Sequence, residues 1–284
     1  MNNKYLTKIK RFFQFGNRSF RDYRLFIEKA KRNGFEFVPL MEFTKEKKLN
    51  EKIIGLRHDV DSELNHALKI AKIEHDLGVQ ATYFVLHTAS YFYSNISKHR
   101  LNSKLIEKLV YLQDTLGHEV GLHIDLMPIE VIFKRDPIAY ARNLIALLRD
   151  HGINIVGVAH HGNLFHHIYR NKYVVKDKEI KQQIFADPYT IFDTKMLDVD
   201  YEVCTLPHDL FFSDADFIHN KRWDYSCIDE GFFEENGRTI ILTHAIHWAP
   251  SLYYYFTVNF VITIRYAFRY LNEYFKIRKQ IEID

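Results

Sequence analysis

The stretch KIIGLRHDVDSELNHALKIAKIEHDLGVQATYFVLH, residues 52–87, decides the expected fold. It opens with a β-rich apolar run, KIIGLRHD, and continues with apolar residues at helical spacing. Gly78 then supplies a helix terminator, and VQATYFVLH reads as a second strand. A strand, a helix and a strand in this order predict a βα unit of a parallel sheet.

The same alternation continues toward the C-terminus. One helix is expected over 101–117, with Asn102 or Ser103 as its N-cap and Gly117 as its terminator. A second helix is expected over 137–152, with Pro137 in its first turn. Further strand-like runs are HEVGLHID (118–125), INIVGVAHHG (153–162), DLFFSDAD (209–216) and RTIILTH (238–244). The sequence therefore predicts an α/β fold with a parallel sheet, open or closed into a barrel.

Composition narrows the class of protein and its location. The chain has 284 residues, of which 47% are hydrophobic and 26% charged, as in a globular protein with a substantial core. A net charge of +3 gives no support for nucleic-acid binding. Cys204 and Cys227 are too few for a disulfide framework. The N-terminus lacks the apolar core of a secretory signal, so a cytoplasmic location is expected.

Both ends of the chain differ from the central region 51–250. Residues 1–50 are expected to form a basic, helical extension packed on the central domain, and 251–284 an aromatic C-terminal helix. The segments LTKIKRFFQF (6–15) and RYAFRYLNEYFKIRK (265–279) pair basic with aromatic residues, as interfacial membrane segments do. Peripheral contact with the inner face of a membrane and packing on the domain exterior are both compatible with this pattern. A membrane-spanning helix in 239–264 is disfavoured because Pro250, Ser251, Asn259 and two His interrupt the apolar run.

Five predicted strands end in residues capable of acid–base or metal chemistry. Because active sites of parallel α/β proteins lie beyond the carboxyl ends of the strands, these residues are expected to meet at one rim. They are His58, Asp59 and Asp61; His123 and Asp125; His160 and His161; Asp214; and His244. Each residue alone has an ordinary structural interpretation, since a single His is usually structural and Asp61 or Ser62 could cap the following helix.

Asp59 and Asp61 lie two residues apart, so on an extended backbone they point to the same side. Two neighbouring carboxylates repel each other unless a cation or a proton lies between them. Carboxylate and imidazole ligands suit zinc or another borderline divalent ion, with a position left for water. A second carboxylate beside such an ion is well placed as a general base.

The ordered segments RHDVD (57–61), GVQATYFV (78–85), GHEVGLH (117–123) and IILTH (240–244) resemble the motifs of the NodB-homology polysaccharide deacetylases. The resemblance covers about residues 51–250. It implies a distorted seven-stranded (β/α) barrel, here with extra helices at the N- and C-termini. It also implies Asp59 as catalytic base, Asp61 and His123 as metal ligands, and His244 as the acid that protonates the leaving amine. The implied cofactor is zinc, with cobalt or nickel as alternatives.

The sequence departs from the family pattern in two places. Met127 stands where the family has a second His ligand, so the third ligand is expected to be Asp125 or His161. No Arg occurs in AHHGN (159–163), where the family has the Arg that orients the base, so Arg57 or Arg222 is expected to substitute. Further residues expected to contact substrate or support the site are His58, His160, Asp214, Arg222, Trp223 and His247.

The resemblance implies a metal-dependent hydrolase that removes an N-acetyl group from an amino sugar. The segments RHDVD, AHHGN and THAIHW (243–248) are similar to those of deacetylase-like proteins of surface-polysaccharide, O-antigen type, biosynthesis. The expected partner is accordingly an N-acetylated glycan or a lipid-linked glycan precursor. The alternatives are hydrolysis of another C–N bond, and a non-catalytic carbohydrate-binding protein built on the same barrel.

Overall fold

A computed structural model describes residues 19–46, 51–95, 100–126, 129, 135–161, 194–214 and 236–248. Met127, Arg222, Trp223 and the two chain-end segments lie outside these ranges. The helices are α2 (Phe20–Arg32), α3 (Leu64–Asp76), α4 (Ser103–Val110), α6 (Pro137–Asp150) and α9 (Thr194–Leu197). The strands are β1 (Glu36–Phe37), β2 (Lys52–Val60), β3 (Thr82–Leu86), β4 (Tyr93–Asn95), β5 (Arg100–Leu101), β6 (Glu119–Ile124), β7 (Gly157–His160), β8 (Tyr201–Glu202), β9 (Leu210–Ser213) and β10 (Gly237–His244).

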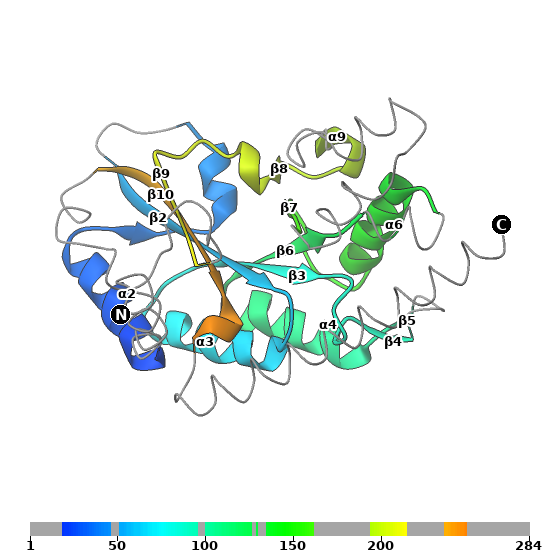
Figure 1. Cartoon of the computed structure of the whole chain (residues 1–284), viewed down its shortest axis with the longest axis horizontal. Helices are drawn as coiled ribbons and strands as arrows, with labels where there is room; N and C mark the ends of the chain where they lie inside the picture. Colours follow the sequence, from blue (N-terminus) through cyan, green and yellow to red (C-terminus); the bar gives the residue numbers. More distant parts are fainter. Residues whose placement is uncertain are drawn as a thin grey trace, which may run out of the picture.

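Seven strands form one parallel sheet in the order β8-β7-β6-β3-β2-β10-β9, and β1 adds a short parallel pairing to β2. The sheet is curled. Its curl is evident from one apolar cluster on its inner side, which contains Phe84 of β3, Ala159 of β7, Tyr201 of β8 and Ile240 of β10. Within the described residues, β8 and β9 are the two ends of this sheet, and no hydrogen-bonded pairing joins them. The expected α/β fold with a distorted seven-stranded (β/α) barrel is confirmed (Figure 1).

The helices cover the outer side of the sheet, where the larger apolar core lies (Figure 1). Their ends follow the expected capping chemistry. The Asn102 side chain accepts a hydrogen bond from Lys104 N, and Asp136 caps α6 directly before Pro137. Gly78 and Gly117 follow α3 and the π-turn after α4 with positive φ, as helix-terminating glycines do.

The amino-terminal end of the barrel is closed by a 3₁₀ helix, η2 (Leu40–Thr44). Leu40 and Phe43 are fully buried, and Leu40 N donates to Thr82 Oγ1 at 2.8 Å. Met41 N donates to Glu119 Oε2 at 3.0 Å, which ties the same turn to β6. With this end closed, the carboxyl ends of the strands are left to form a site.

Several elements differ from the sequence prediction, and two of them, β7 and β8, pair with each other in the sheet. Strand β8 was not expected, because two residues without an apolar run leave no periodic signal. Strand β7 begins only at Gly157, later than the expected run from 153. The reason is that side chains bind the backbone before it: Arg149 donates to Ile155 O at 2.7 Å, and Gln113 Oε1 accepts from Asn154 N at 2.7 Å. No helix within the described ranges has the length and hydropathy of a membrane span.

Candidate functional site

Strands β2, β6, β7, β9 and β10 bring His and Asp side chains together at the carboxyl rim of the barrel. Asp59 lies near the end of β2 and Asp61 directly follows it, His123 lies near the end of β6, and His161 directly follows β7. Asp214 follows β9, and His244 ends β10 in register with Asp59. Parallel pairing carries all five strand ends to the same edge, as expected from the sequence.

Asp61, His123 and His161 form the first cluster, and their donor atoms lie within 4.8 Å of one another. His123 Nε2 lies 3.5 Å from Asp61 Oδ1, and His161 Nε2 lies 3.7 Å from Asp61 Oδ2. Asp61 Oδ1 is buried and has no hydrogen-bond partner among the described residues. Asp61 does not cap α3, because the N-cap residue is Glu63, in a left-handed conformation with φ 52° and no side-chain cap.

The two imidazoles are oriented from behind by their Nδ1 atoms. His123 Nδ1 donates to the Ala159 carbonyl at 2.8 Å, and His161 Nδ1 donates to Asp125 Oδ2 at 3.3 Å. These bonds leave both Nε2 atoms facing Asp61. A His whose far nitrogen donates to a carbonyl or carboxylate is the usual arrangement of a metal ligand.

The donor set fits a tetrahedral divalent ion. Zinc–ligand distances of about 2.0–2.1 Å place tetrahedral donors about 3.3–3.4 Å apart, close to the 3.5 and 3.7 Å found here. One carboxylate and two imidazoles also match the residue types that bind zinc with a further position left free. Of the two candidates for the third ligand, His161 faces the centre of the cluster, and Asp125 supports it from behind.

Charge in this cluster also favours a cation. Burial raises the pKa of Asp61, but the hydrogen bond and charge of His161, with His123 and His244, lower it well below its usual range. Burial lowers the pKa of His161, but Asp125 and Asp61 outweigh it and raise the pKa to about 10. Burial lowers the pKa of His123, which keeps its imidazole neutral as a ligand requires. A proton or a metal ion must therefore balance the carboxylates.

Asp59 lies beside this cluster and is held by Arg57. Arg57 Nε and Nη2 donate to the two oxygens of Asp59, both at 2.8 Å, from two residues away on the same face of β2. Asp59 Oδ2 lies 3.3 Å from His123 Nε2. Burial raises the pKa of Asp59, but the charge and the hydrogen bonds of Arg57 outweigh it and lower the pKa. Asp59 is therefore an oriented carboxylate that stays ionised.

His244 and His247 share one buried carboxylate, Asp214. Their Nδ1 atoms donate to Asp214 Oδ1 at 2.6 Å and Oδ2 at 2.8 Å, and Thr243 Oγ1 donates to Oδ2 at 3.0 Å. These separations are hydrogen-bond lengths, shorter than those between the ligands of one metal ion. Burial lowers the pKa of His244, but Asp214 and, more weakly, Asp61 and Asp59 raise it to about 9. His244 therefore carries a proton at neutral pH, with its Nε2 3.7 Å from Asp61 Oδ2.

His58 is a correction to the expected site. It is fully buried on the opposite face of β2, where its Nε2 lies 2.7 Å from Glu74 Oε1. Tyr23 and Tyr83 donate to the same carboxylate. Neighbouring residues of a strand point to opposite sides, so His58 cannot join Arg57 and Asp59 at the rim.

His160 pairs in register with Ile124, a residue of the outer core. This pairing places His160 on the face of the sheet away from His123.

Within the described part of the chain, Arg57 is the group that orients Asp59. Arg222 and Trp223 lie outside the described residues. No sequence pattern predicts the Ala159 carbonyl that orients His123, because a backbone group leaves no residue-type signal.

No protein-family model matches the sequence, and no curated protein matches it. Solved structures do align with the chain. A family 4 carbohydrate esterase from Bacillus anthracis is 16% identical over 84% of this chain and 84% of that one, with a TM-score of 0.37. The catalytic domain of a peptidoglycan N-acetylglucosamine deacetylase from Eubacterium rectale is 15% identical over 71% and 81%, with a TM-score of 0.42. A Streptococcus mutans CE4 esterase is 14% identical over 74% and 80%, with a TM-score of 0.43. The structural neighbours of this chain thus include carbohydrate esterases and deacetylases at low sequence identity.

Proposed function

We propose that this chain is a metal-dependent hydrolase that removes an N-acyl group, such as acetyl, from an amino sugar of a cell-surface polysaccharide or its lipid-linked precursor. The observation that carries the proposal is one juxtaposition. A three-donor cluster, Asp61, His123 and His161, lies between an ionised carboxylate, Asp59, and a protonated imidazole, His244. Amide hydrolysis needs these three functions side by side.

The two flanking groups have complementary protonation states. Asp59, kept ionised by Arg57, accepts a proton from the attacking water as the water oxygen bonds to the acyl carbon. His244, kept protonated by Asp214, gives its proton to the nitrogen as the carbon–nitrogen bond breaks. A divalent ion held by Asp61, His123 and His161 would polarise the acyl carbonyl and lower the pKa of the water. The products are a carboxylate and an amine.

Side-chain exposure agrees with this division of roles. Asp61, His161 and His244 are 24%, 14% and 15% exposed, whereas Asp59 and His123 are 4% and 2% exposed. A substrate at the rim can therefore reach the acid and the metal position, while the base lies deeper. We assign to His247, which is held on Asp214 beside His244, the role of binding a substrate oxygen next to the amide.

The position of His161 weakens the alternative that the chain is a non-catalytic carbohydrate-binding protein. That alternative drew its support from Met127, which replaces the usual second His ligand. A third donor from the β7 end supports retained metal chemistry instead. The scarcity of cysteines is the basis for proposing that the reaction takes place in the cytoplasm.

Acetate release by zinc-loaded protein from a panel of N-acetylated glycans tests the proposal. Asp59→Asn and His244→Ala should each lower turnover by about 10²–10⁴-fold, with a much smaller effect on glycan affinity. Asp198→Asn and His151→Ala, exposed positions away from the rim, are the matched controls and should retain full turnover. If no glycan yields acetate, yet one binds wild type and both rim variants equally, the carbohydrate-binding alternative is correct.

A further inference from the structure

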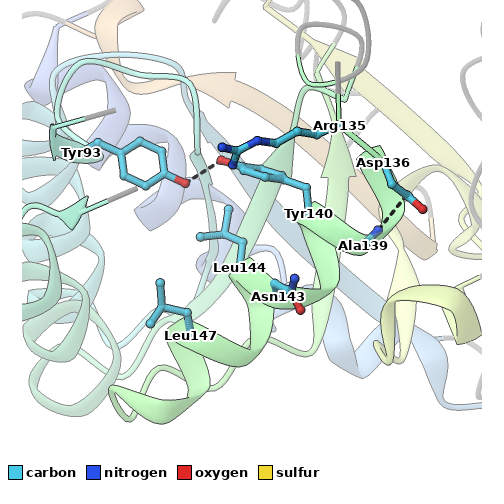
Figure 2. A pocket seen from close by; sticks show the side chains of 8 residues that line it. All are labelled: Tyr93, Arg135, Asp136, Ala139, Tyr140, Asn143, Leu144 and Leu147. Atoms are coloured by element: carbon cyan, nitrogen blue, oxygen red, sulfur yellow. Dashed lines mark hydrogen bonds between the residues drawn. The ribbon is translucent and has the colours of Figure 1, made fainter. Parts of the chain in front are cut away.

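A cavity separate from the clusters at the rim lies between helix α6 and strand β4, with a volume of about 330 Å³ (Figure 2). This volume falls within the range of about 300–1,000 Å³ typical of small-molecule sites. The lining residues that matter here are Tyr93, Arg135, Asp136, Tyr140, Asn143 and Leu147. None of them belongs to the acid–base or metal-binding groups of the rim.

Two tyrosine hydroxyls form the polar floor of this cavity. Tyr93 Oη and Tyr140 Oη lie 2.6 Å apart, and the side chains approach each other from opposite walls (Figure 2). Burial raises the pKa of both phenols, although the charge of Arg135 opposes the shift. Both phenols therefore remain neutral hydroxyl groups, able to donate and to accept hydrogen bonds.

The rest of the lining selects a neutral ligand with an apolar face. Arg135 and Asp136 carry opposite charges, so the lining has no net charge to favour an ion, and the Asp136 carboxylate also caps α6. Leu147 and the tyrosine rings offer apolar surface, and Asn143 offers an amide donor and acceptor. A pyranose ring matches this lining, because its carbon–hydrogen face is apolar and its edge carries hydroxyl groups.

The cavity and the rim share one wall. Tyr140 Oη lies 3.5 Å from His87 Nδ1, and His87 Nε2 accepts a hydrogen bond from Asp125 N at 3.0 Å. Asp125 in turn orients His161. Burial lowers the pKa of His87 to about 4, so it is a neutral spacer rather than a charge between the two sites. The lining residue Tyr140 is therefore linked to the metal-binding cluster through His87 and Asp125.

We propose that this cavity binds a neutral pyranose unit of the glycan, separate from the N-acyl sugar at the rim. The assignment rests on the proposed function for its choice of substrate. It makes the protein selective for an oligosaccharide over a single amino sugar, because two binding positions in one chain add their contributions to affinity.

Calorimetric titration of the zinc-loaded full chain with N-acetylglucosamine oligomers of two and five units tests the inference. The wild type should bind the five-unit oligomer about tenfold more tightly than the two-unit oligomer. Leu147→Trp fills the cavity and should bring the two affinities together, without weakening the two-unit oligomer. Leu25→Trp, at an exposed position of α2, is the matched control and should retain the wild-type ratio.

Asn143→Ala, at an exposed position, gives an independent test that does not depend on tolerance of the larger side chain. It should lower the preference for the longer oligomer about fivefold. Equal binding of both oligomers by the wild type, absence of binding, or an unchanged ratio in both cavity variants would each overturn the inference. Length-dependent binding without acetate release would instead refute the proposed hydrolysis and leave the cavity assignment intact.

Discussion

Metal affinity separates the roles of His161 and Asp125. His161 presents Nε2 to the cluster at 3.7 Å from Asp61 Oδ2, while Asp125 contacts only the far nitrogen of the same ring, at 3.3 Å. Loss of a group that orients a ligand typically lowers metal affinity by about 10–100-fold. This corresponds to about 1.4–2.7 kcal/mol of binding free energy. Asp125→Asn should therefore weaken zinc binding by this amount, and His161→Ala should weaken it further.

Competition with a chromophoric chelator measures these affinities without reference to catalysis. Asp198→Asn, which alters an 86% exposed carboxylate, is the matched control and should bind zinc as the wild type does. Equal losses in Asp125→Asn and His161→Ala would refute the ligand assignment, and so would wild-type affinity in His161→Ala.

The ligand role of His161 also predicts that zinc binding releases a proton. With its pKa raised to about 10, His161 is protonated at neutral pH and must lose that proton to bind zinc, so calorimetry in buffers of different ionisation enthalpy should detect about one proton released per ion.

Three further perturbations test the fold and the chain ends. Glu74→Ala should cost about 3–5 kcal/mol in urea unfolding, because it leaves buried His and Tyr partners unpaired, whereas Glu107→Ala on the surface of α4 should cost little. Gly157→Ala should cost about 1–3 kcal/mol in the same assay, because its Cβ would clash with the buried Tyr201 ring; an unchanged midpoint would contradict that packing. The chain-end segments 6–15 and 265–279, if interfacial, should carry the full-length protein with anionic liposomes in flotation at low salt, and an unbound protein would favour packing on the barrel exterior.

Local patterns in the sequence predicted most of the rim. Asp59, His123 and His244 were identified because parallel strands carry their carboxyl ends to one edge, a rule that needs only strand order. His58 was assigned wrongly to this group because the rule locates a strand end but does not distinguish its two faces. The choice between His161 and Asp125 required coordinates, since both follow strands and both bear metal-binding groups.

Features built from distant segments left no sequence signal. Strand β8 forms by pairing with β7 rather than through its own two residues. The cavity is lined both by Tyr93 and by a helix that begins more than forty residues later. The Tyr93–Tyr140 hydrogen bond, across 47 positions, links these two segments. The residues of the cavity would have been interpreted individually as an edge-strand aromatic and ordinary helix positions. Contacts of this kind depend on the curl of the sheet, which strand propensities do not encode.

The alternation along β2 has a consequence for how this chain can diverge. Arg57 and Asp59 face the rim while His58 faces Glu74 of α3, so one strand serves two polar clusters on opposite sides of the sheet. Deleting or inserting a single residue within β2 would turn Asp59 toward Glu74 and bury two like charges together, while removing the base from the rim. Point substitutions can alter either cluster separately, but a change in strand length disrupts both at once. Descendants of this sequence should therefore vary β2 by replacement and place their length changes in the connections around it.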